Sequence, residues 1–389
     1  MSDVGISSIA GYLPRLRLSK KTVSSANSWL APNLVGKGKG TRSMANWDED
    51  SVTMAVEAVR RILGGDDDRS HVDTLFFAST TMPFVDRLNS GIMRAALTLE
   101  EETQCVDISS TLKSGTSALI QAIDKVKSGN SNYSIVSAAD KRKTRSASSQ
   151  ELDFGDGSVA IAVDTKNLIA KYINSSSLSI DFVDHFRGPG EEFDYNWEER
   201  WVRDEGYLKI VPKAIKDLFT KANISGSDID HFILPSVFPR VDQMISKKCD
   251  INPENVAGNL AQSVGDTGSA HSLLMFASVL EKAKPGEKIL ICGFGGGSDV
   301  LLFEATDNIK NFKPQQTIEN LLETGVEENN YMKFLTFNDT VKWERGMRGE
   351  QDRKTALTTL YRHNDAIMGL VGGKCSKTGT IQYPASPIS

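Results

Sequence analysis

The segment 104–126 constrains the fold of this chain more than any other. We expect its first five residues, 104–108, to form a short buried strand. Small and hydroxyl residues follow and predict a tight turn, after which 116–126 has the apolar spacing of a helix. A buried strand that turns sharply into a helix is a unit of layered α/β folds, so we expect a fold of that class.

The alternation of strands and helices continues on both sides of this segment. In the first half we expect a helix over 48–63, where an acidic first turn suits the helix dipole, and another over 91–99. The strands expected there are 4–10, 74–79, 133–138 and 158–163. The second half repeats the pattern, with helices expected at 207–222, 242–248 and 269–282 and strands at 231–235, 288–292 and 300–303.

Composition excludes several function classes. The formal net charge is -5, whereas proteins that bind nucleic acid or a membrane surface usually carry a basic excess. No stretch approaches the roughly 18 apolar residues of a membrane span, and the N-terminus lacks a basic-then-apolar signal peptide. The 4 cysteines have no paired spacing, so we expect reduced thiols and a cytoplasmic protein.

The turn after the first strand of this unit resembles the nucleophile elbow of the condensing enzymes. These are 3-hydroxy-3-methylglutaryl-CoA synthase and the ketoacyl-ACP synthases that start fatty acid chains. The matching residues are Asp107-Ile-Ser-Ser-Thr-Leu-Lys-Ser-Gly-Thr-Ser-Ala-Leu119. Four more segments resemble parts of the same enzymes. Residues 36–44 resemble the entry loop, and 151–157 resemble the "fGDGA" turn. Residues 264–271 resemble the "GNxxxAS" turn, and 284–297 resemble the closing strand with its glycine loop.

This resemblance covers about residues 3 to 310 and implies a thiolase-superfamily fold. That fold is α/β, with five αβαβα layers made of two similar halves. We expect the halves at 1–165 and 166–310, followed by a C-terminal extension at 311–389. The resemblance also implies a homodimer that acts on a coenzyme A thioester, with no metal.

Three positions that carry the chemistry of the resembled enzymes are changed. The acyl-accepting cysteine falls on Leu112, which cannot attack a thioester. The histidine falls on Pro235 or Ser236, depending on the alignment, and the asparagine falls on Asp266. The glycines that shape the turns remain, which predicts new chemistry or a structural role on a retained scaffold.

Several residues are candidates for the missing roles. Asp266, at the mouth of an apolar tunnel, would act as a general base with a raised pKa, or it is a turn residue that binds nearby amides. His271 would pair with Asp266 or be satisfied by the backbone. His185 lies in an aromatic and charged insertion whose composition suits a lid or a partner surface. We interpret Cys105 as a packing residue on the first strand of the elbow unit and not as a displaced nucleophile.

A glycine-spaced basic loop is the predicted site for the CoA phosphates. Lys37, Lys39 and Arg42 supply charge there, and the glycines let the backbone approach an anion. The alternative is a flexible, solvated loop. Gly295 and Gly296 in the closing glycine loop are the other predicted CoA contacts.

The extension resembles the start of the zinc-ribbon and OB-fold domain that accompanies many thiolase-like proteins. Its first cysteine is Cys375, but the second cysteine position holds Thr378. One thiolate does not make a structural zinc site, which needs about four ligands. We therefore interpret this end as a short helix and a docking strand without metal.

The leading functional hypothesis is an aldol, retro-aldol or Claisen-type step on an acyl-CoA without a covalent acyl-enzyme. The second hypothesis is a non-catalytic subunit that binds a catalytic thiolase or an OB-fold acyl-CoA carrier. The third is an ordinary synthase-like acyltransferase whose nucleophile lies elsewhere. The acyl group and the direction of the reaction stay open.

Overall fold

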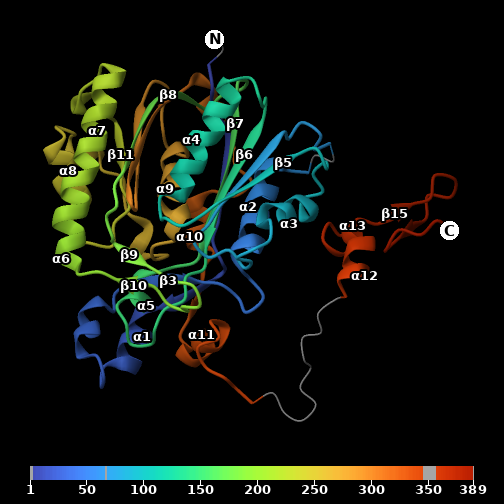
Figure 1. The fold of residues 1–389 in the computed structure, drawn as a ribbon, viewed down its shortest axis with the longest axis horizontal. Helices are drawn as coiled ribbons and strands as arrows, with labels where there is room; N and C mark the ends of the chain where they lie inside the picture. The colour runs from blue at the N-terminus through green and yellow to red at the C-terminus, as the bar shows by residue number, and fades with distance from the viewer. Residues whose placement is uncertain (1–2, 66–67, 345–355, 389) are drawn as a thin grey trace.

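A single nine-stranded mixed sheet runs through the molecule (Figure 1). This computed structural model describes residues 3–65, 68–344 and 356–388. The strand order is β11-β12-β13-β8-β1-β7-β6-β4-β5. The nine strands are β1 (Gly5–Tyr12), β4 (Thr74–Ala78), β5 (Gln104–Ile108), β6 (Ser134–Asp140), β7 (Gly157–Asp164), β8 (Ala170–Ser179), β11 (His231–Ile233), β12 (Lys288–Phe294) and β13 (Gly297–Ala305).

The two halves of the sheet meet where β1 pairs with β8. β4 pairs in parallel with β5 and β6, whereas β7 is antiparallel to both β6 and β1. In the second half β11 and β12 are parallel, and β13 is antiparallel to both β12 and β8. Only Gly5 and Ile6 of β1 are in register with β8, so a short seam joins the halves.

Helices cover both faces of each half of the sheet. α4 (Ser114–Lys127) and α9 (His271–Leu280) pack against strands of both halves and against each other. α2 (Ser51–Leu63) and α3 (Asn89–Ala96) cover the outer face of the first half, and α7 (Leu208–Ala222) and α8 (Val241–Lys248) that of the second (Figure 1). A central helical layer between two sheet halves with outer helices is the expected mixed α/β arrangement, and the fold-class prediction is confirmed.

The helix and strand predictions for this core agree with the structure to within a few residues at each end. α2, for example, begins at Ser51 because the Asp50 side chain accepts from the Thr53 amide and Thr53 reciprocates in a capping box. One central strand was missed. β8 is rich in serine and lacks the apolar character of a buried strand, yet it pairs with β13 over nine residues.

The first part of the extension packs on the core. α10 (Ile318–Glu323) buries Ile318 in the central apolar cluster, and β14 (Val326–Glu328) pairs in parallel with β2 (Leu16–Ser19). β2 in turn pairs with β3 (Thr41–Met44). Residues of these two strands and of α11 (Tyr331–Phe337) form a further apolar cluster. Residues 311–344 therefore pack as part of the core. The domain boundary expected at residue 310 stays a prediction.

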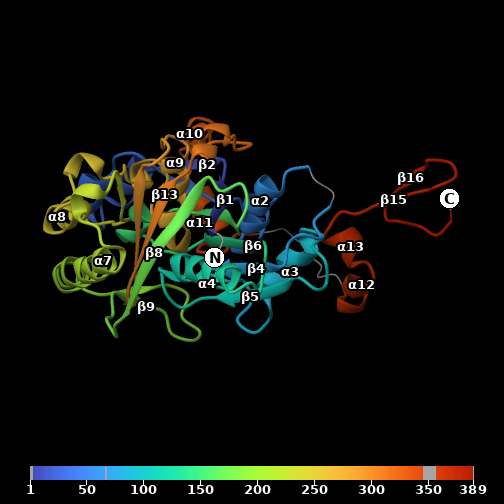
Figure 2. The ribbon, with the colours of Figure 1, turned by 90° about the horizontal axis from the view of Figure 1, so that it is seen from above.

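The last described segment, 356–388, projects from the body beside α3. α12 (Leu357–Arg362) and α13 (Asn364–Ile367) lie nearest the body, and the short hairpin of β15 (Gly373–Lys374) and β16 (Ile381–Gln382) extends away from it in both views (Figures 1 and 2). Within the described residues, no helix has the length and apolar character needed to cross a bilayer.

Candidate active site

A pocket of about 260 Å³ opens where the carboxyl ends of β5, β6, β11 and β12 converge. Binding sites of open α/β sheets commonly lie beyond the carboxyl ends of strands, because the loops that follow them meet there. The pocket is lined by the elbow after β5, the segment after β6, α5 (Gln150–Asp153), the turn after β11 and the turn before α9. It brings together the changed positions Leu112, Ser236 and Asp266 and the candidate His185.

The elbow places Leu112 against the pocket. Ser110 adopts a left-handed conformation with φ 80°, which reverses the chain between β5 and α4. The Thr111 hydroxyl donates to the Gly295 carbonyl at 2.6 Å, so the closing glycine loop holds the elbow. A Cβ on Gly295 would lie 2.6 Å from Thr111 Oγ1, so only glycine fits this close approach.

A buried carboxylate ties the start of α4 to the second half of the sheet. Asp299 on β13 pairs with Lys113 at 3.0 Å and accepts from the hydroxyls of Thr116 and Ser117 at 3.2 and 2.6 Å. These contacts fix the direction of α4 and therefore the position of the elbow. At Gly296 the nearest atom to the position of a Cβ is the Ile180 carbonyl oxygen, at 4.0 Å. The CoA role of Gly295 and Gly296 stays a prediction.

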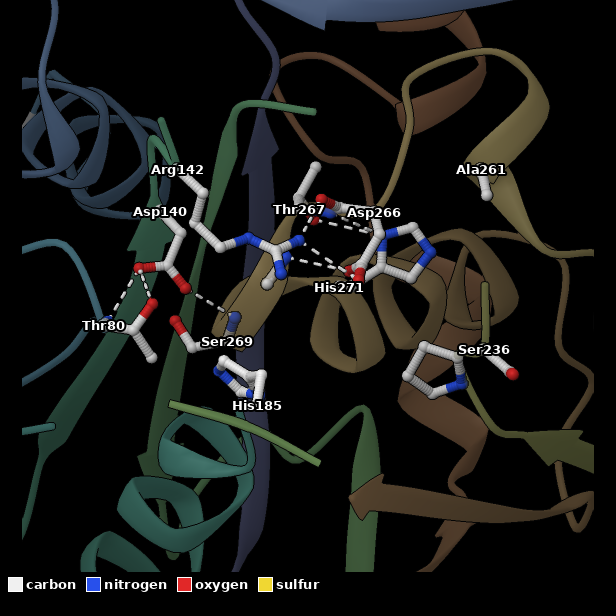
Figure 3. Close-up of polar contacts among 12 residues, drawn as sticks. Thr80, Asp140, Arg142, His185, Ser236, Ala261, Asp266, Thr267, Ser269 and His271 are labelled. Carbon is white, nitrogen blue, oxygen red and sulfur yellow. Dashed lines mark hydrogen bonds and ion pairs between the residues drawn. The ribbon is translucent and has the colours of Figure 1, made fainter. Parts of the chain in front are cut away.

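Asp266 is held in an ion pair with Arg142. Arg142 Nη2 lies 3.1 Å from Asp266 Oδ2 and also donates to the Asp266 carbonyl at 2.6 Å (Figure 3). Burial acts to raise the pKa of Asp266, but Arg142, His271 and the Gly268 amide outweigh it and lower that pKa below its usual value. The expectation of a raised pKa is therefore wrong in direction, because the sequence did not reveal the neighbouring guanidinium.

Asp266 also closes its own turn. Its Oδ1 accepts from the Gly268 amide at 2.9 Å, the contact that the alternative role as a turn residue requires. Nearby, Asp140 accepts from the Thr80 amide at 2.7 Å and from the Ser269 amide at 2.7 Å (Figure 3). These contacts join the ends of β4 and β6 to the turn that carries Asp266.

Of the two alternatives for His271, the structure has the contact with the backbone and not the pair with Asp266. Its Nδ1 accepts from the Thr267 amide at 3.1 Å, so its Nε2 carries the proton and donates to Asn259 Oδ1 at 3.1 Å. Burial lowers the pKa of His271, and the negative charge of Asp266 only partly offsets this. Both ring nitrogens of this neutral histidine are occupied, which leaves it no free lone pair for a substrate.

The turn after β11 is built around Ser236. Its hydroxyl accepts from the Phe238 amide at 3.0 Å and donates to the Phe238 carbonyl at 3.3 Å, so it serves the turn. Tyr207 packs beside it, with its hydroxyl donating to the Pro235 carbonyl at 3.4 Å. Burial, together with Asp266 and Asp184, raises the pKa of Tyr207 far above that of a free phenol.

Tyr207 lines the pocket and lies at the end of a locally widened helical turn. Residues Val202–Tyr207 form a π-helical turn that leads into α7, and such turns often mark functional sites. Pro212 inside α7 has no amide proton to donate to the Leu208 carbonyl. Lys248 Nζ donates to that carbonyl instead, at 2.6 Å, so a side chain replaces the missing backbone contact.

The aromatic and charged insertion forms one wall of the pocket. Asp184 and His185, at the start of the hairpin of β9 (His185–Phe186) and β10 (Tyr195–Asn196), both line it. His185 Nδ1 lies 2.9 Å from Asp184 Oδ2. Burial acts to lower the pKa of His185, but Asp184 and Asp194 outweigh this and raise it above its usual value.

The predicted basic loop is divided by the structure. Lys37 is near the pocket, because its Nζ lies 3.2 Å from Asp153 and 3.9 Å from Glu199, which both line the pocket. Lys39 is exposed. Arg42 lies on β3 with none of its surface exposed, donates to the Glu151 carbonyl at 3.0 Å and pairs with Asp156. This buried position fits neither the predicted contact with a CoA phosphate nor the alternative of a flexible, solvated loop.

The cysteines lie outside the pocket lining. Cys105 is half-buried on β5, and burial raises the pKa of its thiol. Cys249 and Cys292 are buried in the cluster under α7 and α8, and Cys375 is in the projecting hairpin. In that hairpin the Cys375 amide donates to the Thr380 carbonyl at 2.8 Å. Across the described residues no three His, Cys, Asp or Glu side chains gather to hold a metal ion.

Sequence reasoning missed two pocket residues, Arg142 and Tyr207. Arg142 follows a buried strand within the basic run 141–143, and a charged residue at that position was a usable signal. Tyr207 gave no signal, because no local pattern in the sequence indicates its contact with the turn after β11.

Known proteins resemble this chain over most of its length. The family model described as "3-Oxoacyl-[acyl-carrier-protein (ACP)] synthase III C terminal" matches residues 219–301. Hydroxymethylglutaryl-CoA synthase of Caldivirga maquilingensis is 28% identical over 351 residues, covering 88% of this chain and 99% of the relative. The same enzyme of Methanopyrus kandleri is 24% identical over 350 residues, covering 89% and 98%.

Solved structures agree in fold. A crystal structure of HMG-CoA synthase complexed with CoA superposes with a TM-score of 0.78 at 18% identity, covering 91% of this chain and 95% of that one. The 3-oxoacyl-(acyl carrier protein) synthase III of Pseudomonas aeruginosa gives a TM-score of 0.69 at 18% identity, covering 78% and 98%. The chain therefore has the thiolase-like fold, and among proteins with that fold its sequence is similar to hydroxymethylglutaryl-CoA synthases.

Proposed function

We propose that this protein binds an acyl-CoA and acts on a carbon–carbon bond of its acyl group without forming an acyl-enzyme. The observation that carries this proposal is Leu112 in the wall of the pocket, at the end of a strand-turn-helix elbow. An alkyl side chain at that point cannot accept an acyl group. It leaves a pocket whose elbow wall is apolar and whose other walls carry ionised and hydrogen-bonding groups.

Neither a thiol nor the Ser236 hydroxyl fills this gap. The pocket lining contains no cysteine, and Cys292 on the nearest strand is fully buried in the cluster behind it, where burial raises the pKa of its thiol well above the usual value. The Ser236 hydroxyl is engaged within its turn. These contacts argue against the third hypothesis, an ordinary synthase with a displaced nucleophile.

The relatives supply the substrate class. The names of the similar proteins refer to hydroxymethylglutaryl-CoA synthesis, and one similar structure holds CoA. A pocket of about 260 Å³ is smaller than the ~300–1,000 Å³ of typical small-molecule sites. This volume suits a short acyl group with the thiol end of the pantetheine, while the nucleotide stays outside the pocket. An aldol, retro-aldol or Claisen-type step then takes place at the carbon next to the thioester carbonyl.

The direct test is a search for an acyl-enzyme. Intact-protein mass spectrometry after incubation with acetyl-CoA and with acetoacetyl-CoA should show the unmodified mass. The Leu112→Cys variant is the matched comparison. A thiol at the start of α4 lies where a helix N-terminus favours the thiolate, so an acetyl adduct is expected on that variant. A stoichiometric adduct on the natural protein, on any residue, would refute the proposal.

The two exposed lysines of the predicted basic loop, Lys37 and Lys39, should contribute to CoA binding. Replacing Lys37 and Lys39 together by alanine is expected to weaken CoA binding by about 1 kcal/mol per lysine, because both side chains are solvent-exposed and a charge-assisted contact is weaker there. Isothermal titration calorimetry measures this effect. Lys310→Ala, at a surface pair with Asp307, is the control. Equal affinity in the double variant and the control would assign both lysines to solvent.

A second candidate function has one observation in its favour. The projecting segment 356–388 exposes large apolar side chains, among them Tyr361, Leu370 and Ile381, at 86%, 68% and 76% of their surface. Where such exposed apolar side chains form a contiguous patch, they often mark a contact with another protein. A non-catalytic subunit that binds a thiolase or an OB-fold carrier would use it. Purification from the native host separates the two candidates, because such a subunit should arrive with its partner.

A homodimer fits the same architecture. β5 is the outermost strand of the sheet, and its pairing edge carries no neighbour among the described strands. Unpaired edge strands are templates for pairing with another chain. We therefore keep the expected homodimer as part of the proposal, with β5 as its contact.

A further inference from the structure

The insertion hairpin places the dyad of Asp184 and His185 in the pocket wall, and this dyad has no role in the proposal above. We propose that His185 is the catalytic base that removes a proton from the carbon next to the thioester carbonyl, and that Asp184 orients it. This inference rests on the proposed function and names the group that performs its proton transfer. It replaces Asp266, to which the sequence analysis gave that role.

The hydrogen bonding of His185 is that of an oriented base. Its Nδ1 faces Asp184 Oδ2 at 2.9 Å, and a carboxylate can only accept, so Nδ1 carries the proton. The lone pair of the neutral ring is then on Nε2. Among the described residues Nε2 makes no hydrogen bond, which leaves it available to a substrate. A base within reach of the substrate and held by a third group is a recurrent arrangement in proton-transfer sites.

The other titratable groups of the pocket are less suited to act as this base. Asp266 is paired with Arg142 and closes its turn. Asp153 is paired with Lys37. Glu199 lies at the solvent edge, with 70% of its side chain exposed. The buried phenol of Tyr207 has its pKa raised far above neutrality, so it can donate a hydrogen bond but does not act as a base near neutral pH.

The hairpin that carries the dyad is held in place by charged and backbone contacts. Arg187 pairs with Asp194 at 2.7 Å and also donates to the carbonyl of Thr80, at the end of β4. The Trp197 amide donates to the Asp184 carbonyl at 3.1 Å and closes the hairpin behind the dyad. Such fixed positioning is what a catalytic base needs, because a small misplacement of the reacting atoms lowers the rate strongly.

The charges around the ring favour its protonated product. Asp184 and Asp194 stabilise the imidazolium that forms when the base accepts a proton, and Arg142 opposes it. Asp194 Oδ2 is buried and makes no hydrogen bond among the described residues, whereas its Oδ1 is paired with Arg187. The net effect of these neighbours and of burial is to raise the pKa of His185.

The proposed step is balanced without a further reagent. The C–H bond next to the thioester carbonyl breaks, its proton moves to Nε2 of His185, and its electron pair forms the enolate of the thioester. The enolate then attacks a carbonyl carbon in an aldol or Claisen-type step, or regains a proton from the imidazolium. In D₂O the return step delivers deuterium, so the step can be observed even when the second substrate is unknown.

The test is the exchange of the acetyl protons of acetyl-CoA in D₂O, followed by proton NMR with the full-length protein. The natural protein should catalyse this exchange, and His185→Gln should lose about 10²–10⁴-fold in rate. Asp184→Asn should lower the rate less. It should also move the low-pH limb of the rate profile to lower pH, because the neighbour that raises the His185 pKa is gone. His231→Gln, at a histidine that pairs with Glu287 outside the pocket, is the control and should keep the natural rate.

The outcomes separate this inference from the proposed function. Exchange that persists in His185→Gln overturns the assignment of the base and leaves the proposed function standing. No exchange by the natural protein, under conditions where calorimetry shows acetyl-CoA bound, overturns the proposed function itself. As an independent readout, the ring signals of His185 in nitrogen-15 NMR should shift when acetyl-CoA is added. An unchanged His185 spectrum with bound acetyl-CoA also overturns the assignment.

Discussion

Replacing Arg42 by alanine is expected to lower the free energy of unfolding by about 3–5 kcal/mol, the usual cost of removing one partner of a buried ion pair. Arg42 and Asp156 are both almost completely buried, with Nη2 of the arginine 3.7 Å from Oδ1 of the carboxylate. Asp156 Oδ2 accepts from the Ala45 amide at 2.8 Å, but Oδ1 has only Arg42 as its partner among the described residues. Removal of the guanidinium therefore leaves an uncompensated buried charge.

The loss of stability in Arg42→Ala should affect the packing of the extension as well as that of the core. The Arg42 guanidinium lies 4.9 Å from the centre of the Phe334 ring on α11, so the substitution removes a cation–π contact and opens a cavity beneath that helix. Urea unfolding measures the change. Lys37→Ala is the matched control from the same sequence segment, and its exposed pair with Asp153 should cost at most about 1 kcal/mol. Equal stability of the two variants would contradict the buried position of Arg42.

The second large effect is expected for Asp266→Asn. The asparagine keeps an oxygen for the Gly268 amide but presents an amide group to Arg142 Nη2, so two donors face each other. We expect a loss of about 3 kcal/mol, the lower end of the range for a buried pair, because 18% of the Asp266 side chain is exposed. If Asp266 were only a turn residue, the variant would unfold at the same urea concentration as the natural protein.

The pH dependence of this pair provides a further check. The folded-state pKa of Asp266 is below its unfolded value, so its stabilisation is present above the ordinary aspartate pKa and is lost as the pH falls through the folded value. The difference in unfolding free energy between the natural protein and Asp266→Asn should therefore shrink in acid. Asp307→Asn, at an exposed surface pair, should show little difference at any pH. A constant gap down to strongly acidic pH would show that the ion pair is not its source.

The two pocket-side histidines should act in opposite directions near neutral pH. The raised pKa of His185 contributes stability below its ordinary value, which is lost as the pH rises through the folded pKa. The lowered pKa of His271 contributes stability above its ordinary value, which is lost as the pH falls through the folded pKa. The two contributions partly cancel in the pH dependence of the unfolding free energy. The NMR signals of His185 therefore report its protonation more directly.

The elements that the sequence predicted well are those in which local pattern and burial agree. α2 has both an apolar stripe and a capping box, and β4 is a largely apolar strand whose five residues are all buried. β8 shows the opposite case. Its serines are held in the sheet by backbone pairing with β13, and backbone hydrogen bonds leave no trace in the side-chain pattern. The short strand β3 was not predicted either. A charged residue such as Arg42 is typical of an exposed loop, but on β3 it is fully buried.

What the sequence by itself determined is the layered α/β class, the elbow and the absence of a thiol at Leu112. All three follow from residues close together in the chain. Only the tertiary structure decided how the charges are paired. Arg142 and Asp266 are 124 positions apart, Arg42 and Asp156 are 114 apart, and each pairing reverses an expectation drawn from one partner alone. Asp184 and His185 are adjacent in the sequence, but only the hairpin brings them to the elbow, because the position of a loop is set by what it packs against and not by its own residues.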